Sequence, residues 1–267
     1  MTKIRSTVLF LLSLLAITVA CSGGEEPRFR PRASAQDHAP HPSTTTRQAA
    51  PPPSTTVTVA PPPPTSAAPA TPADPRLLNP AALTATAPAH FAVELTTTEG
   101  AIIIDVTRAW SPNGADRFYN LVQNGFFDDV AFFRVIDGFM AQTGISGNPQ
   151  VAAAWQHANI QDDPAGVQHN SRGFVSFATA GPNTRTTQFF INLVDNSRLD
   201  GMGFSPFGRV RDMTHVDALY HGYGESAPAG HGPTQGRLQS EGNAYLRASF
   251  PELDYIRSAR ILPAAGH

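Results

Sequence analysis

The most informative residue of the chain is an arginine that stands in an otherwise apolar segment. Arg134 lies in the run FFRVIDGFMAQ, residues 132–142, where most neighbours are aromatic or aliphatic. A guanidinium in such surroundings is unstable unless it has hydrogen-bond partners or a ligand. We therefore predict that Arg134 has a binding function.

Amide side chains accompany this arginine in two predicted strands. Gly138 divides residues 132–142, and Arg134 and Gln142 stand at equal distances from it. A hairpin folded about that glycine would make the two side chains cross-strand neighbours. In a second run, QFFINL, alternation places Gln188, Phe190 and Asn192 on the face opposite the core. Such an apolar floor with a few polar groups is typical of a pocket for a small molecule or a peptide.

Short strands dominate the rest of the globular part. One helix is expected after Ser111, which can cap it, with Pro112 at its first position and Gly125 at its end. Many short strands without a βαβ rhythm favour a closed or nearly closed antiparallel barrel. Alternation predicts a strand over residues 91–96, and a turn then leads to a second hairpin strand over 101–106. Further strands are expected over residues 173–178, 188–193, 207–210 and 256–262.

The C-terminal third contains an extended region, residues 215–251, to which we assign no chemistry. It includes a Gly-rich loop over residues 222–236 and a short helical stretch near Tyr245. The glycines lack the lysine and helix of a phosphate-binding loop, and the histidines lack metal-ligand spacing. We expect no metal and no cofactor. Asp162 and Asp163 are interpreted as a solvated turn.

The N-terminus has the features of an export signal. Lys3 and Arg5 precede an apolar run over residues 8–19, and Cys21 follows directly after small residues. This arrangement resembles a bacterial lipobox, although Thr18 replaces the usual Leu; cleavage near Ala20 without lipidation is the alternative. We predict a signal peptide over residues 1–20, a lipidated Cys21 and a disordered Pro/Ala/Thr-rich linker over residues 21–89. The globular domain is expected over residues 90–267.

Three blocks of sequence resemble the cyclophilin family of peptidyl-prolyl cis-trans isomerases. They are FFRVIDGFMAQ (132–142), GFVSFA with GPNT and QFFI (173–191), and LDG with FGRV (199–210). The resemblance covers roughly residues 91–213, with the blocks in the family's order. It implies a mainly β fold, a closed eight-stranded antiparallel barrel capped by two helices, with the site on its outer face.

The resemblance also implies roles for individual residues. Arg134 matches the catalytic arginine, which would stabilise a twisted X–Pro amide over a hydrophobic proline pocket. The partners implied are proline-containing polypeptides, and we expect a monomer. The positions that match the family's substrate-binding residues are Phe139, Met140, Gln142, Ala178, Thr179, Ala180, Gln188, Phe190, Leu199 and Phe204.

Four positions depart from the family's pattern. Phe133 replaces a common His, and Thr179 replaces a common Asn. Arg198 stands where a tryptophan important for cyclosporin binding is usual, so we predict weak drug sensitivity. Phe204 falls near the position of a pocket histidine, next to one extra residue.

Composition and context narrow the function. A formal charge of −2 gives no indication of nucleic-acid binding. We predict an isomerase of X–Pro bonds in exported proteins, on the periplasmic side of a bacterial envelope and attached to a membrane only by lipid. Two other functions remain open: a proline-recognising scaffold or chaperone with weak catalysis, and an envelope structural protein whose linker matters more than its barrel. For Arg134 itself, the alternative is an ordinary surface arginine.

Overall fold

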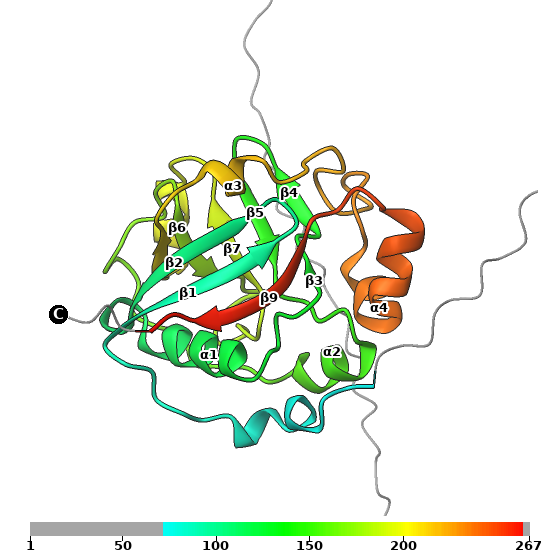
Figure 1. Ribbon diagram of the computed structural model, residues 1–267. Coiled ribbons are helices and arrows are strands. Elements are labelled where there is room, and N and C mark those ends of the chain that lie inside the picture. Colours follow the sequence, from blue (N-terminus) through cyan, green and yellow to red (C-terminus); the bar gives the residue numbers. More distant parts are fainter. Residues whose placement is uncertain (1–71, 264–267) are drawn as a thin grey trace, which may run out of the picture. The chain divides into compact units, whose positions relative to one another are not determined.

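The computed structural model describes residues 72–263, and its main feature is one curled antiparallel sheet (Figure 1). The strand order in this sheet is β3-β9-β1-β2-β8-β6-β7-β5-β4. The strands are β1 (His90–Thr97), β2 (Ala101–Thr107), β3 (Val130–Ala131), β4 (Arg134–Ile136), β5 (Met140–Thr143), β6 (Phe174–Phe177), β7 (Phe189–Asn192), β8 (Pro206–Val210) and β9 (Tyr255–Ile261).

The sheet has nine strands rather than the eight expected, because residues 130–136 form two short strands, β3 and β4, instead of one. β3 pairs with β9 at one edge, and β4 pairs with β5 at the other. Only Phe132 and Phe133 separate β3 from β4, and both side chains are fully buried. The same short segment therefore joins the two edges of the sheet, and Arg134 is the first residue of β4.

Four α-helices and four 3-10 helices occur in the described residues, more than the two capping helices expected. α1 lies against β8 and β9, and α2 lies beside α4 (Figure 1). α4 is kinked at Gly242, which has a positive φ of 62°. The helices are α1 (Pro112–Gln123), α2 (Pro149–Trp155), α3 (Thr214–Asp217), α4 (Gln235–Ser249), η1 (Pro75–Leu78), η2 (Pro80–Ala82), η3 (Arg108–Trp110) and η4 (Ser197–Met202).

The N-terminus of α1 is capped by a residue that the sequence did not indicate. The Ser111 side chain does not cap the helix; its Oγ donates to Asp163 Oδ2 at 2.7 Å. The backbone N–H groups of Asn113 and Gly114 also donate to the Asp163 carboxylate, at 2.8 and 2.9 Å. Asp163 is only 5% exposed, so its prediction as a solvated turn residue is wrong. A carboxylate from a distant loop supplies the cap instead.

The core separates into a main cluster inside the sheet and a second cluster beneath α4. In the main cluster, the Phe118 ring of α1 lies 5.0 Å from Phe207 and 5.5 Å from Phe189. In the second, Phe133 is buried together with Leu238 and Leu246 of α4. The C-terminal helix is thus packed against the segment that leads into Arg134.

Part of the expected linker belongs to the packed domain. Leu77 is buried, and its carbonyl accepts from Trp155 Nε1 at 2.8 Å. The Asn120 side chain bonds the backbone of Ala85 at 2.9 and 2.7 Å. The globular domain therefore begins at least a dozen residues before residue 90, where we expected its start. The predicted signal peptide, Cys21 and the linker up to residue 71 lie outside the described residues.

Removal of the α1 cap should destabilise the fold without touching the site. Asp163→Ala would leave two helix N–H groups and the Ser111 hydroxyl without their acceptor, so we expect a loss of about 2 kcal/mol of unfolding free energy. Chemical denaturation followed by circular dichroism measures this loss. Glu252→Ala removes an exposed carboxylate and is the control. An Asp163→Ala midpoint equal to that of the unsubstituted protein would contradict the assignment of the cap.

Candidate active site

The register of three strands places three of the predicted site residues in one row. Arg134 of β4 pairs with Gln142 of β5, which in turn pairs with Phe190 of β7. The expectation that the hairpin makes Arg134 and Gln142 cross-strand neighbours is confirmed. Because side chains that are directly opposite on neighbouring strands point to the same face, these three lie side by side.

A chain of hydrogen bonds runs from the guanidinium through three glutamines. Arg134 Nη1 donates to Gln142 Oε1 at 2.9 Å, and Gln142 Nε2 donates to Gln188 Oε1, also at 2.9 Å. Gln188 Nε2 then donates to Gln235 Oε1 at 3.3 Å. Gln142 is only 7% exposed, so these bonds fix its orientation as well as satisfying its polar atoms.

An apolar group, which we call the Met140 cluster, lies beside the guanidinium and apart from the main core. Arg134 Nη1 is 3.7 Å from Met140 Sδ, and Arg134 Cζ is 5.8 Å from the Phe139 ring centroid. Arg198 Cζ lies over the same ring at 4.8 Å. The cluster consists of buried Met140, Phe190 and Leu199, with Ile136, Phe139, Ala178 and Phe204 packed against them.

Most residues assigned by resemblance to the proline pocket therefore come together. Phe204 lies in the cluster, with its ring 5.6 Å from that of Phe190, despite the extra residue nearby. Ile136 is a member that the sequence reasoning missed, although its position two residues after Arg134 in a strand could have indicated it. Thr179 and Ala180 follow β6, and the hydrogen bonds that join them to Gly181 and Thr184 lie within the loop.

The acidic partner of Arg134 was not predicted. Arg134 Nε donates to Glu225 Oε1 at 2.5 Å, and Nη2 donates to Glu225 Oε2 at 2.6 Å. The Ser226 backbone N–H also donates to Glu225 Oε1 at 2.8 Å. Side-chain exposure is 20% for Arg134 and 37% for Glu225, so the ion pair is partly buried. The two residues are 91 positions apart, and no spacing rule links them.

The guanidinium changes the acid–base behaviour of its partner. Hydrogen bonds from Arg134 hold the pKa of the Glu225 carboxyl below its ordinary value, against the opposing effect of burial. The Glu225 carboxylate therefore remains ionised at neutral pH. Its contribution to stability is present above the ordinary pKa of a glutamate and is lost as the pH falls through the lowered value.

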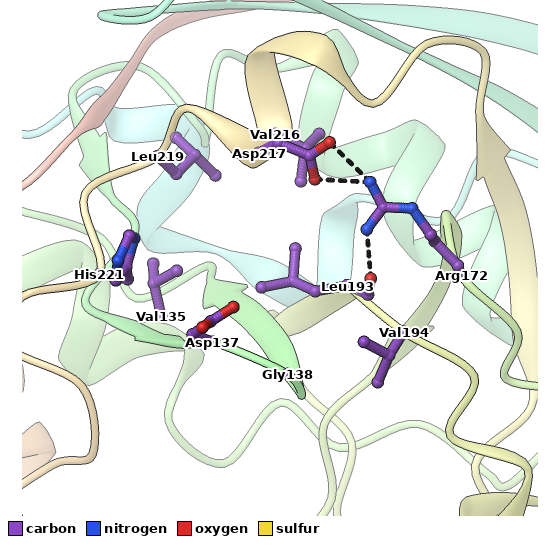
Figure 2. A pocket seen from close by; sticks show the side chains of 10 residues that line it. All are labelled: Val135, Asp137, Gly138, Arg172, Leu193, Val194, Val216, Asp217, Leu219 and His221. Carbon is purple, nitrogen blue, oxygen red and sulfur yellow. Dashed lines mark hydrogen bonds and ion pairs between the residues drawn. The ribbon is translucent and has the colours of Figure 1, made fainter.

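A separate pocket of about 340 Å³ opens on another part of the β4–β5 hairpin (Figure 2). It is lined by apolar side chains that include Val135, Leu193 and Leu219, with Arg172 bonded across it to Asp217 at 2.6 and 2.8 Å. None of the predicted site residues lines it. Arg172 is paired with Asp217 there, and Asp137 and His221 also line the pocket.

The described residues contain neither a metal-binding group nor a membrane-spanning helix. No group of three or more metal-ligating side chains is close enough to hold an ion there. Over residues 72–263, no helix has both the length and the apolar character needed to cross a membrane.

Comparison with known proteins agrees with the geometry. Residues 92–230 match the protein family described as "Cyclophilin type peptidyl-prolyl cis-trans isomerase/CLD". "Peptidyl-prolyl cis-trans isomerase-like 1" of Rhizopus delemar is 37% identical over 126 residues, which are 46% of this chain and 76% of that protein. "Peptidyl-prolyl cis-trans isomerase cyp18" of Streptomyces antibioticus is 33% identical over 147 residues, 52% of this chain and 88% of that protein.

A solved structure shares the fold. The cyclophilin type peptidyl-prolyl cis-trans isomerase cgd2_1660 of Cryptosporidium parvum superposes with a TM-score of 0.50 at 20% sequence identity, covering 66% of this chain and 99% of that one. The chain described here therefore belongs to the cyclophilin-type peptidyl-prolyl cis-trans isomerases and is an isomerase of this type.

The coupling between Arg134 and Glu225 makes a prediction about titration. Arg134→Ala removes the donors that lower the Glu225 pKa, so this pKa should rise toward its ordinary value near 4.5. NMR titration of the ¹³C-labelled carboxyl measures the change. Arg198→Ala, which removes the other guanidinium over Phe139, should leave the Glu225 pKa where it is. An unchanged Glu225 midpoint in Arg134→Ala would show that the ion pair does not form in solution.

Proposed function

We propose that Arg134 is the catalytic residue and that the Met140 cluster receives the proline ring of an X–Pro peptide. The observation that carries this proposal is the position of Arg134 Nη1, which is 3.7 Å from Met140 Sδ at the edge of the cluster. A charged donor and an apolar surface for a ring are thus adjacent. Gln142, which was also assigned by resemblance, accepts a hydrogen bond from Arg134, and Gln188 in turn accepts one from Gln142.

The reaction requires rotation about a partial double bond. Amide resonance keeps the peptide bond planar and gives a rotation barrier of about 18–20 kcal/mol. At the top of this barrier the resonance is lost, and the prolyl nitrogen becomes pyramidal with a localised lone pair. No covalent bond is made or broken. A group that stabilises the twisted amide more than the planar one therefore accelerates the reaction.

The donor next to the cluster fits this requirement. A hydrogen bond from Arg134 toward the proline nitrogen and carbonyl region would favour the twisted form, while the apolar cluster holds the ring. The short run Ala178, Thr179 and Ala180 follows β6 beside the cluster, where the backbone of the substrate would lie. Phe204 would complete the apolar surface around the ring.

Cellular context forms a second part of the proposal. An apolar run after Lys3 and Arg5, followed by Cys21 and a Pro-rich segment, supports export and lipid attachment in a bacterial envelope. Proline-containing polypeptides that fold outside the cytoplasm would then be the substrates. These N-terminal residues lie outside the part of the chain that the structure describes, so this inference depends on the amino-acid pattern.

One observation favours a second function, a proline-recognising scaffold or chaperone with weak catalysis. Glu225 already binds two of the three nitrogens of the Arg134 guanidinium, which reduces the net positive charge next to a substrate. Measurable affinity for unfolded proteins combined with slow turnover would support this function over efficient isomerisation.

Arg134→Ala should lower kcat/KM for an X–Pro peptide by about a hundredfold, the typical effect of losing one donor to a transition state. NMR exchange spectroscopy of a short proline peptide measures the rate directly. Arg260→Ala, which removes an exposed arginine on β9, should react at the unsubstituted rate. Equal rates for Arg134→Ala and the unsubstituted protein would refute the catalytic role of Arg134.

The mature N-terminus can be tested separately. After expression of the full chain in a bacterium, mass spectrometry should find an N-terminal peptide that begins at Cys21 and carries the mass of attached lipid. Cys21→Ser should remove this mass and release the protein from the membrane fraction. An unlipidated mature N-terminus in the unsubstituted protein would contradict the anchor.

A further inference from the structure

Residues 215–251, to which we assigned no chemistry, contain the acidic partner of Arg134. Glu225 lies between α3 and α4, in a loop that is closed by its own backbone. Gly232 N–H donates to the Glu225 carbonyl at 2.8 Å, and Ala227 N–H donates to the Gly232 carbonyl at 3.0 Å. A side chain at Gly230 would meet the Glu225 carbonyl oxygen at 2.4 Å, so this turn requires glycine there. The loop therefore holds Glu225 in a defined place.

The Glu225 carboxylate binds the Nε–Nη2 edge of the Arg134 guanidinium, and Nη1 remains on the side of the Met140 cluster. Glu225 accepts from Nε and Nη2 in a two-point contact, the geometry that best orients a planar guanidinium. Nη1 is directed to the opposite side, where it meets Gln142 Oε1 and Met140 Sδ. Glu225 thus binds the edge that does not face the Met140 cluster.

One of the two Nη1 hydrogens faces a weak acceptor. Gln142 Oε1 accepts a normal hydrogen bond at 2.9 Å, whereas the thioether sulfur of Met140, at 3.7 Å, accepts poorly. An oxygen or nitrogen of a bound peptide would be a better partner for that N–H than the sulfur. The donor that substrate can use is therefore already aimed at the cluster.

We propose that Glu225 is a positioning residue for the isomerase reaction: it fixes Arg134 so that the Nη1 N–H points over the Met140 cluster. This inference rests on the proposed catalytic role of Arg134. Without Glu225, the long arginine side chain would be held through Nη1 alone and could swing away from the cluster. Electrostatic catalysis depends on donors that are in place before the reaction, so this loss of order should slow the rotation step.

If the Glu225 carboxylate instead blocked the site, its removal would raise the rate of isomerisation. A blocking group would occupy the donor that substrate needs. The hydrogen bonds of the Glu225 carboxylate join it to Nε, Nη2 and the Ser226 backbone, whereas Nη1 meets Gln142 and Met140. The geometry therefore favours positioning.

Substitutions at Glu225 test the proposal in the full-length protein, with kcat and KM for a proline peptide obtained separately by NMR exchange. We expect Glu225→Ala to lower kcat about tenfold and to change KM by less than about twofold. Glu225→Gln keeps one acceptor oxygen and should recover part of the lost kcat. In the Arg134→Ala background, Glu225→Ala should have no further effect, because its action passes through the guanidinium.

Glu241 offers a matched control in the same C-terminal region. It forms an equivalent two-point ion pair with Arg237 on α4, at 2.7 and 2.8 Å, and it is not one of the hydrogen-bond partners of Arg134. Glu241→Ala should therefore leave kcat unchanged. Thermal unfolding of each variant shows whether it is folded, and if Glu225→Ala does not fold, Glu225→Gln decides the question with an expected loss of about threefold in kcat.

The outcomes separate this inference from the proposed function. If Arg134→Ala is slow but the folded Glu225 variants match or exceed the unsubstituted kcat, Glu225 does not position Arg134 and the catalytic role of Arg134 stands. The same conclusion follows if only KM changes, or if Glu225→Ala slows the Arg134→Ala background further. If Arg134→Ala is as fast as the unsubstituted protein, the proposed function itself fails.

Discussion

A guanidinium among apolar side chains is tolerated only if its N–H groups meet acceptors, and this constraint organises the site around Arg134. Three partners meet it: Glu225 at Nε and Nη2, Gln142 at Nη1, and the Met140 sulfur, which accepts weakly. The first two are strong and orient the side chain. The third is the position at which a substrate atom would improve the contact. Three N–H groups of Arg134 thus have strong acceptors, and the Nη1 N–H that faces the Met140 sulfur is the one that the proposed chemistry uses.

The fold supports this arrangement from two directions. The β4–β5–β7 register brings Arg134, Gln142 and Phe190 into one row from the strand side. From the other side, α4 is anchored by the second cluster, in which Phe133 is buried with Leu238 and Leu246. Phe133 departs from the family's usual histidine and directly precedes Arg134. This aromatic side chain attaches the C-terminal region to the strand that carries the arginine. That region in turn delivers Glu225 and Gln235 to the site.

Local sequence patterns predicted contacts between residues that are close in the chain, but they did not predict contacts between distant residues. Alternation and the Gly138 turn were enough to pair Arg134 with Gln142, and six of the residues named by resemblance lie together in the Met140 cluster. Glu225 could not be found, because its contact spans 91 positions and its loop has no periodic pattern. Asp163 was missed for the same reason: Ser111 is a suitable local cap, but a carboxylate from a distant loop replaced it. Residues 72–89 have a linker-like composition, yet a few buried contacts, such as that of Leu77 with Trp155, are enough to fix them.

The central claim concerns one donor, Arg134 Nη1, and one surface, the Met140 cluster. The most direct measurement is an experimental structure of the protein with a bound X–Pro peptide. The account predicts a proline ring against Met140, Phe190 and Leu199, a peptide atom within about 3 Å of Nη1, and Glu225 still on the opposite edge of the guanidinium. A peptide bound elsewhere, or an Arg134 side chain turned away from it, would contradict the account.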